Sequence, residues 1–305
     1  MDDGSDLQIL VGKPRAGDNV SAAAADGRLT VVATPIGNLS DISPRARATL
    51  RDADVIACED TRRTGVLLKA LELKVPLVSL HAHNETARLP ELLARLGDGA
   101  RVVIVSDAGM PGVSDPGARL VDAAHAAGYP VEVIPGPSAV TAAIAASGAP
   151  ADRFAFAGFW PRKAGDRTAL LADLDRLGWP VVAFESPRRV AAVLAGVAAE
   201  DPQRRVAVCR ELSKLHEETL VGPASELAAR FAGEPPRGEI TLVLWPRGGG
   251  GRAAADAERL QEVVAILMDA GLSPGRTADV AARVGAGARN TAYRTALAEA
   301  KRRNT

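Results

Sequence analysis

Short β-rich runs alternate with amphipathic stretches from Leu29 onward, and this alternation constrains the fold more than any other feature of the sequence. The runs LTVVA, DVIAC, VPLVSL, RVVIVS and VEVIP each precede a stretch with helical periodicity. Strands that alternate with helices are typical of a mostly parallel sheet covered by helices. We therefore predict an α/β domain over residues 29–149.

Residues that begin and end helices support this prediction. Ser43 before Pro44 and Asp115 before Pro116 are typical of a helix N-cap followed by proline at the first helical position. Gly148 is typical of a helix end.

A second series of strands follows Pro150, with the runs RFAFAGF, VVAFE, RVAVCRE, HEETLVG and EITLVLW. The interval between RVAVCRE and HEETLVG is too short for a crossover helix, so we expect these two strands to be antiparallel. The sequence thus predicts a second α/β domain with a mixed sheet over residues 150–246.

The ends of the chain differ from the two α/β domains. Residues 1–28 lack the basic and apolar regions of a signal peptide, and we expect a disordered leader. The four glycines at 248–251 predict a linker over residues 247–252. Helical periodicity at 254–270, 274–284 and 289–302 predicts a helical module resembling a helix-turn-helix over residues 253–305.

Charge and cysteine content limit the partners and the compartment. The chain has 37 basic and 37 acidic side chains, so any RNA contact must use local patches. Cys58 and Cys209 each lie in an apolar run, which indicates reduced core thiols and favours the cytoplasm. No run approaches 18 apolar residues, so we expect no membrane span.

Three turns after predicted strands have unusual compositions: TPIGNLSD, SDAGMPGVSDPG and PGPSA. Ligands of open parallel sheets bind beyond the carboxyl ends of the strands. Gly37 would allow close approach of a ligand, Asp107 could accept hydrogen bonds from a ribose diol or an ammonium group, and Ser138 opens a helix. Each turn taken alone is equally explained as a capped loop. The first is not GxGxxG, which disfavours a dinucleotide fold.

Polar residues that follow the second and third strands are candidates for acid–base chemistry. We select Glu59, Asp60 and His83, although helix capping is an alternative role for the first two. Further candidates are His81, Glu85, Glu185 and Glu211. The i, i+2 spacing of the two histidines, without a cysteine nearby, does not favour zinc, and we predict no metal site.

Basic residues cluster beside these turns and are candidates for phosphate contacts: Arg62, Arg63, Arg162, Lys163, Arg188, Arg189, Arg210 and Lys214. The alternative is a solvated surface. Phe159 next to Trp160 could stack on a base, or pack in the core. The basic helical module could clamp RNA, extend a dimer interface or act as a plain helical cap.

The order of the motifs points to one family. TPIGNLSD, ACEDTRRTGVLL, SLHAHNE, SDAGMPGVSDPG, PGPSA, GFWPRK, ESPRR, RELSKLHEE and GEITLVL occur in this order over residues 29–245. The chain resembles the ribosomal RNA small-subunit methyltransferase I family, which has the tetrapyrrole methylase fold. The resemblance implies methyl transfer from S-adenosylmethionine to the ribose 2′-hydroxyl of a cytidine in the decoding centre of 16S ribosomal RNA. It also implies a homodimer, with the cofactor held between the two domains.

The resemblance further implies a set of cofactor contacts, in the first domain Pro35, Gly37, Asp107, Gly109, Pro111, Ser114, Ser138 and Ala139, and in the second Phe159, Leu212 and Thr241. A base is expected as well, because a positioned base contributes about 10²- to 10⁴-fold. Two alternatives are a methyltransferase of tetrapyrroles on the same fold and a non-catalytic RNA-binding factor that keeps the fold as a scaffold.

Overall fold

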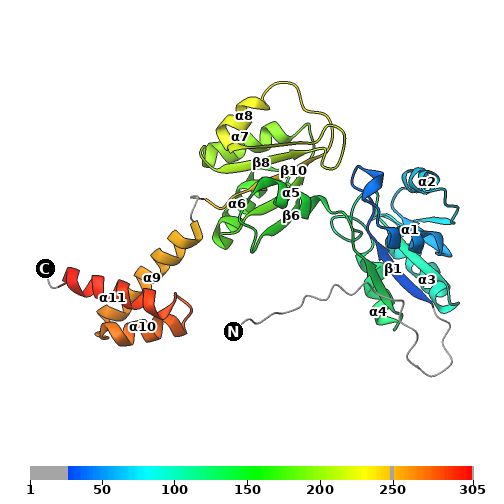
Figure 1. Ribbon diagram of the computed structural model, residues 1–305. Coiled ribbons are helices and arrows are strands. Elements are labelled where there is room, and N and C mark those ends of the chain that lie inside the picture. The colour runs from blue at the N-terminus through cyan, green and yellow to red at the C-terminus, as the bar shows by residue number, and fades with distance from the viewer. Residues whose placement is uncertain (1–26, 248–250, 304–305) are drawn as a thin grey trace, which may run out of the picture.

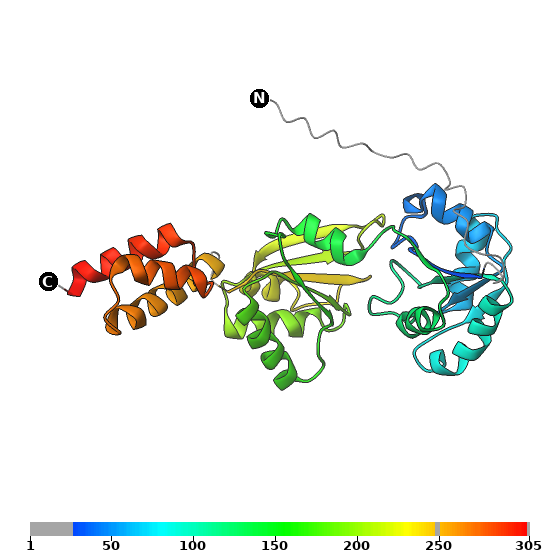
Figure 2. The ribbon, with the colours of Figure 1, turned by 90° about the horizontal axis from the view of Figure 1, so that it is seen from below.

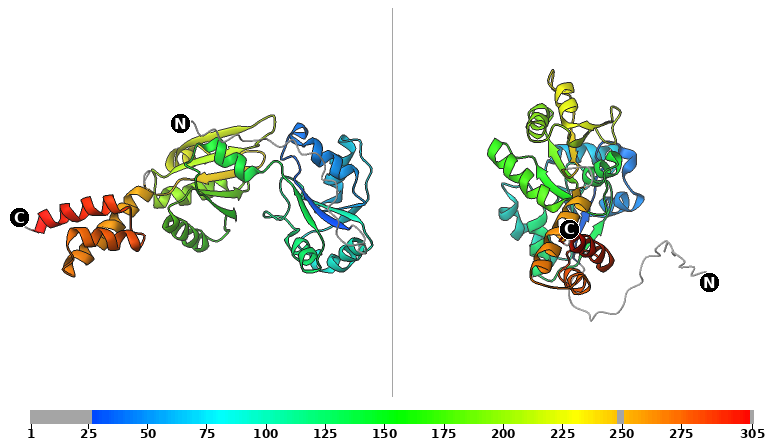
Figure 3. Two further views of the ribbon diagram at one scale, coloured as in Figure 1. Left: turned by 60° about the horizontal axis from the view of Figure 1, so that its bottom comes forward. Right: turned by 90° about the vertical axis from the view of Figure 1, so that its left-hand side faces the viewer.

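Two α/β domains and a group of C-terminal helices follow one another along an elongated molecule (Figure 1). The computed structural model describes residues 27–247 and 251–303. Figure 2 and the left view of Figure 3 show the same order, with the C-terminal helices at one end and the first domain at the other.

The first domain contains a parallel sheet, as predicted. Its strands are β1 (Arg28–Val32), β2 (Val55–Cys58), β3 (Leu77–Ser79), β4 (Arg101–Val105) and β5 (Val131–Ile134), in the order β3-β2-β4-β1-β5. Every pairing is parallel. All the carboxyl ends therefore lie at one edge of the sheet, and the turns after the strands gather there.

Helices cover both faces of this sheet. On one face lie α1 (Pro44–Arg51) and α2 (Thr61–Ala70), whose leucines pack with Val32 of β1. On the other lie α3 (Glu85–Gly97) and α4 (Ala118–Ala126), which pack with Val31. Neighbouring residues of a strand point to opposite faces, so β1 contributes to both cores.

Two predicted helix starts have different outcomes. Ser43 caps α1, because its hydroxyl accepts a hydrogen bond from the Ala46 N–H at 3.0 Å. The prediction that Asp115 caps the next helix is wrong, because α4 begins at Ala118. The Glu85 carboxylate accepts from the N–H of Gly117 at 3.0 Å and of Arg119 at 3.2 Å, so a residue distant in sequence caps this end.

The second domain has the predicted mixed sheet. Its strands are β6 (Ala155–Phe159), β7 (Val181–Glu185), β8 (Arg205–Arg210), β9 (Glu218–Pro223) and β10 (Ile240–Leu244), in the order β6-β7-β10-β8-β9. β6 and β7 are parallel, and the other pairs are antiparallel. The pairing of β8 with β9 confirms the antiparallel pair expected from their short connection.

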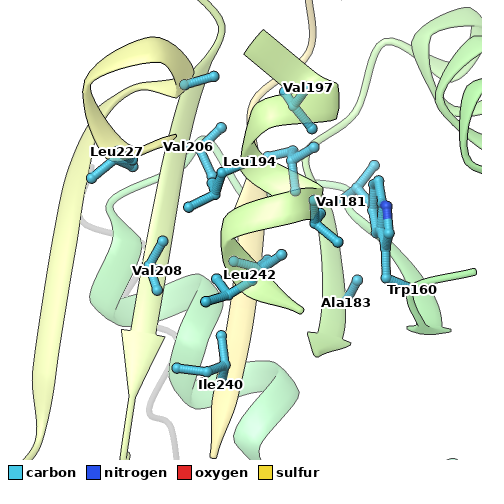
Figure 4. Close-up of a cluster of buried hydrophobic side chains, with 14 of the residues drawn as sticks. Trp160, Val181, Ala183, Leu194, Val197, Val206, Val208, Leu227, Ile240 and Leu242 are labelled. Atoms are coloured by element: carbon cyan, nitrogen blue, oxygen red, sulfur yellow. The ribbon is translucent and has the colours of Figure 1, made fainter. Parts of the chain in front are cut away.

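One face of the second sheet carries the larger core. It is covered by α6 (Ala164–Leu177), α7 (Val190–Glu200) and α8 (Ala224–Arg230). Figure 4 shows Leu194 and Val197 of α7 directed toward the sheet, with Trp160 beside Val181. The sheet and these helices exclude water from a continuous apolar layer, which is the main source of their stability.

The other face is covered by α5 (Ala139–Ser147), which corrects the predicted domain boundary at residue 150. Ala143 and Ile144 of this helix pack with Val182, Cys209 and Val243 of the second sheet. The chain therefore crosses between the domains at the PGPSA turn, eleven residues earlier than predicted. The helix ends at Gly148 with φ of 70°, as its sequence predicted.

The C-terminal helices are α9 (Gly251–Asp269), α10 (Pro274–Arg283) and α11 (Arg289–Arg303). They bury a small core of their own. The helix α9 begins inside the predicted linker, of which residues 248–250 lie outside the described residues, as do residues 1–26 of the predicted leader. Arg28, the last residue of that leader, begins β1.

Two further predictions concern the cysteines and membrane helices. Cys58 and Cys209 are buried and free, as predicted. Within residues 27–247 and 251–303, no helix has the length and apolar character needed to cross a membrane.

Candidate functional site

The three unusual turns of the first domain meet in space. The N–H of Thr34 donates to the Gly109 carbonyl at 2.9 Å, and the N–H of Gly109 donates to the Thr34 carbonyl at 3.1 Å. A Cβ on Gly109, where φ is 83°, would lie 3.4 Å from Ile36 and 3.6 Å from the Pro137 carbonyl. The positive φ at this position therefore favours glycine, since a Cβ would strain this backbone.

The same turns contact the second domain. Gly37 leaves no space for a Cβ because the Lys214 side chain lies against it. Nearby, the Ser213 hydroxyl donates a hydrogen bond to the Asp41 carboxylate. On the other side, Ser114 Oγ lies 3.5 Å from the Cβ position of Gly158 in β6. The domains thus touch on both sides of these turns.

Strained backbone accompanies these contacts. Ser114, Glu211 and Ser213 have φ values of 63°, 50° and 66°, although none is glycine. Such left-handed residues cost energy and persist only where surrounding contacts hold them, often at functional sites.

A cavity of about 420 Å³ lies between the two domains. Its apolar wall includes Phe159, which is 65% exposed and lies at the end of β6, where the register with β7 shifts between Phe156 and Phe159. The rings of Phe159 and Phe184 lie 5.5 Å apart. The full lining consists of Ile36, Glu59, Arg63, Asp107, Ala108, Ser114, Asp115, Ala139, Phe159, Phe184, Glu185, Ser186, Pro187, Gly238, Glu239, Ile240 and Thr241.

The predicted cofactor residues fall into two groups. Asp107, Ser114, Ala139, Phe159 and Thr241 line the cavity. Pro35, Gly37, Gly109, Pro111, Ser138 and Leu212 are not in its lining. Several of this second group shape the surrounding loops instead, and Leu212 packs in the core between the domains. Their contact with a cofactor stays a prediction.

Sequence reasoning misses several lining residues. It assigns Asp115 to helix capping and gives no role to Gly238 and Glu239. The positions of Gly238 and Glu239 follow from the direction of β10, which runs antiparallel to β7. The first residue of β10, Ile240, therefore pairs with the last residue of β7, Glu185. Residues just before β10 thus share the sheet edge where the parallel strands end.

Three carboxyl groups of the first domain cluster at the cavity. Asp107 accepts from the Asp60 N–H at 3.1 Å and forms an ion pair with Arg63 at 3.2 Å. Burial, then the nearby charge of Asp107, raises the pKa of Glu59. Burial, followed by the charges of Glu59 and Asp107, raises the pKa of Asp115 to about 6.

A second hollow, of about 450 Å³, adjoins the cavity. It is lined by Glu59, Asp60, Thr61, Arg62, Arg63, Ser79 and Asp107. Glu59, Arg63 and Asp107 line both spaces. The second hollow lies at the N-terminus of α2, where free N–H groups and the helix dipole favour anions.

The candidate bases differ in their surroundings. Asp60 caps α2 by accepting from the Arg62 N–H at 2.9 Å, and its hydrogen bonds with the Arg62 side chain hold its pKa well below the usual range. A carboxylate held so strongly in its ionised form is a weak base. His83 is exposed, with its ring 6.0 Å from that of His81. Glu59 therefore has the environment best suited to accept a proton.

The remaining acidic candidates hold loops in place. Glu85 caps α4, as described above. The Glu211 carboxylate pairs with Lys214 at 2.7 Å and accepts from the Glu239 N–H at 2.9 Å. The hydrogen bond from Lys214 lowers the pKa of Glu211.

The basic candidates also fall into two groups, those that are exposed and those that are paired within the protein. Arg62, Arg63, Arg162, Lys163 and Arg188 are exposed, and Arg62 and Arg63 line the second hollow. Arg189 donates to the carbonyls of Trp160 and Pro161 at 2.8 and 2.9 Å, and Lys214 pairs with Glu211 and Glu239. The side chains of Arg189 and Lys214 therefore hold loops of the second domain in place. Arg210 pairs with Glu218 at 3.2 Å.

Comparison with known proteins identifies the family. Residues 28–228 match the family described as Tetrapyrrole (Corrin/Porphyrin) Methylases. A protein from Thermotoga maritima named Ribosomal RNA small subunit methyltransferase I is 46% identical over 218 residues, or 72% of this chain and 98% of the relative. A protein of the same name from Neisseria meningitidis is 40% identical over 279 residues, or 91% and 95% of the two chains. The chain belongs to the ribosomal RNA small subunit methyltransferase I family. The resemblance carried by the sequence motifs is thereby confirmed.

Solved structures of the same fold include more distant methyltransferases. The methyltransferase CobJ has a TM-score of 0.56 at 21% identity, covering 72% of this chain and 95% of its own. Cobalt precorrin-4 methyltransferase has a TM-score of 0.55 at 18% identity, covering 74% and 98%. These similarities confirm the predicted tetrapyrrole methylase fold of this family member.

Proposed function

We propose that this chain is an S-adenosylmethionine-dependent methyltransferase that modifies the ribose 2′-hydroxyl of a cytidine in the decoding centre of 16S ribosomal RNA. The observation that carries the proposal is the 40% identity to a ribosomal RNA small subunit methyltransferase I across 91% of the chain. Three features of the site described above suit this chemistry: the cavity, the candidate base and the exposed basic residues.

The cavity between the domains suits the cofactor. Ile36, Phe159 and Phe184 offer apolar surface for an adenine ring, and the carboxylate of Asp107 can accept hydrogen bonds from hydroxyl or ammonium groups. A structure of uroporphyrin-III C-methyltransferase from Thermus thermophilus, with a TM-score of 0.52, was solved with S-adenosylhomocysteine. When bound, the cofactor supplies an electrophilic methyl group.

We assign the role of general base to Glu59. It lines both the cavity and the adjoining hollow. Its carboxylate can therefore contact the hydroxyl of an RNA in the hollow that points toward a cofactor in the cavity. Its raised pKa makes it a stronger base than an ordinary glutamate. Alignment of the hydroxyl with the methyl group then contributes through proximity.

Exposed basic residues of both domains, two of which line the second hollow, would hold the RNA backbone. Arg62 and Arg63 lie at the start of α2, and Arg162 and Lys163 lie just before α6, in the loop after β6. Phosphate contacts of this kind position the RNA and leave recognition of the nucleotide to other groups. We assign Arg188 the same role. Arg189 and Lys214 are not assigned to RNA binding, because their side chains hold loops of the protein in place.

The test is mass-spectrometric mapping of ribose methylation. The protein and S-adenosylmethionine are incubated with small ribosomal subunits that lack the modification, and in parallel with uroporphyrinogen. We expect one new 2′-O-methylcytidine in 16S RNA, and a rate lower by about 10²-fold or more for Glu59→Gln. Methylation of the tetrapyrrole alone would contradict the RNA assignment. RNA binding without any methylation would favour the non-catalytic scaffold.

We further propose that the protein works in the cytoplasm as a homodimer, as the resemblance implies. Light scattering coupled to size-exclusion chromatography tests the second point, with twice the 31.6 kDa chain mass expected. A monomer at micromolar concentration would contradict it.

A further inference from the structure

The cavity between the domains carries much more negative than positive charge. Five carboxyl groups line it, those of Glu59, Asp107, Asp115, Glu185 and Glu239, which we call the acidic wall. Among the described lining residues, Arg63 is the one basic side chain. The electrostatic potential of these carboxylates therefore attracts a positive charge on a ligand in the cavity, whereas it adds no binding free energy for an uncharged group.

Asp115 is the least compensated member of the acidic wall. Burial is the largest cause of its raised pKa, the negative charges of Glu59 and Asp107 add to that effect, and a hydrogen bond with Ser106 offsets only part of it. Asp107, by contrast, pairs with Arg63, and Glu239 pairs with Lys214 at 3.2 Å. A cation near Asp115 would relieve repulsion that the protein itself leaves in place.

Glu185 provides an independent indication that the cavity is built for a ligand. Its side chain is 1% exposed, and Oε2 lies 3.0 Å from Arg189 Nη2. Among the described residues that oxygen has no hydrogen-bond donor, and the same Arg189 nitrogen donates to the carbonyls of Trp160 and Pro161. A buried carboxylate oxygen without a hydrogen bond is costly, and a donor on a ligand would satisfy it.

We infer that the acidic wall selects its ligand by charge, so that this chain binds the sulfonium S-adenosylmethionine more tightly than the neutral thioether S-adenosylhomocysteine. The inference rests on the proposed function. The two ligands share the adenosine, the α-ammonium and the α-carboxylate, and they differ in one methyl group and in the charge at sulfur. Their relative affinity therefore isolates the effect of that charge. Such a preference promotes release of the product once the methyl group has been transferred.

The experiment is isothermal titration calorimetry of the full chain with each ligand. The measured quantity is the dissociation constant of S-adenosylhomocysteine divided by that of S-adenosylmethionine. We expect this ratio to exceed one in the wild type and to fall about tenfold in Asp115→Asn, which removes the charge at nearly constant shape. Asp115→Glu keeps the charge and should retain the ratio. Asp122→Asn, an exposed change on α4 that is not in the cavity lining, is the matched control.

The possible results distinguish the inference from the proposed function. If Asp115→Asn binds both ligands with the wild-type ratio, the inference is overturned while the proposed function stands. If the wild type binds neither ligand, the proposed function fails, and the inference fails with it. Circular dichroism verifies that the variant is folded. If it is not, Glu59→Gln gives the same test, since Glu59 is the other member of the acidic wall whose pKa is raised.

Discussion

At the scale of single residues, Asp115 shows how a local signal can mislead. An aspartate before a proline is a typical helix start, but here a carboxylate from elsewhere in the chain occupies that position, and α4 begins after Gly117. A Cβ on Gly117, where φ is 127°, would overlap the Ile104 side chain. Local sequence cannot reveal such a partner, because Glu85 and Gly117 are brought together only by the packing of α3 on α4. Asp115 is thereby free to face the cavity.

The raised pKa of Asp115 predicts a pH-dependent stability in the unliganded protein. Its pKa is about 6 in the folded state, against an ordinary value of 3.8, so its protonation favours folding. This contribution is complete below pH 3.8 and is lost as the pH rises through 6. We expect Asp115→Asn to be more stable than the wild type by about 1–2 kcal/mol at pH 8, after allowance for partial exposure, and this difference to fall by about half at about pH 5. Urea unfolding at the two pH values measures this. An equal difference at both would show that the charge is not the cause.

At the scale of elements, the sequence is sufficient to predict every strand in the described residues. The reason is that β-branched runs such as RVVIVS are bounded by turns and largely buried, so pattern and propensity agree. Fewer of the site residues than of the strands can be predicted from the sequence. The turns with Gly37 and Asp107 can be recognised by composition, whereas the contribution of Gly238 depends on the antiparallel placement of β10. Similarly, the apolar sequence of α5 predicts a buried helix without indicating which sheet buries it.

The link between α3 and α4 can be tested by Glu85→Ala. The variant leaves the N–H groups of Gly117 and Arg119 without their acceptor, at the end of a helix that carries one wall of the site. We expect a loss of about 2 kcal/mol in the free energy of unfolding, measured by urea denaturation. Glu91→Gln on the exposed side of α3 is the control, with a change below about 0.5 kcal/mol. Equal losses in the two variants would argue against the capping role.

At the scale of the whole molecule, the site depends on how the two domains meet. The turn after β1 lies against the loop that follows β8, with Gly37 beside Lys214 and Asp41 bonded to Ser213. A side chain at Gly37 would meet the Lys214 side chain and the Leu212 carbonyl, and would push these two loops apart.

We therefore expect Gly37→Val to weaken S-adenosylmethionine binding at least about tenfold while changing the melting temperature little. Calorimetric titration and a thermal melt measure the two quantities. Gly65→Ala on α2, where a Cβ meets nothing within 4 Å, is the control and should bind normally. Wild-type affinity in Gly37→Val would mean that the cavity does not depend on this contact.

The crossing of the chain at the PGPSA turn determines where this molecule can be divided. A cut at residue 150 would leave α5 attached to the wrong half and would expose Val182, Cys209 and Val243 to solvent on a bare sheet. A cut before Ala139 gives each half both of its helical layers. Gene fusions, split reporters and circular permutants built from this enzyme should therefore place their new ends ahead of α5, where the two halves could reassemble without an aggregating surface.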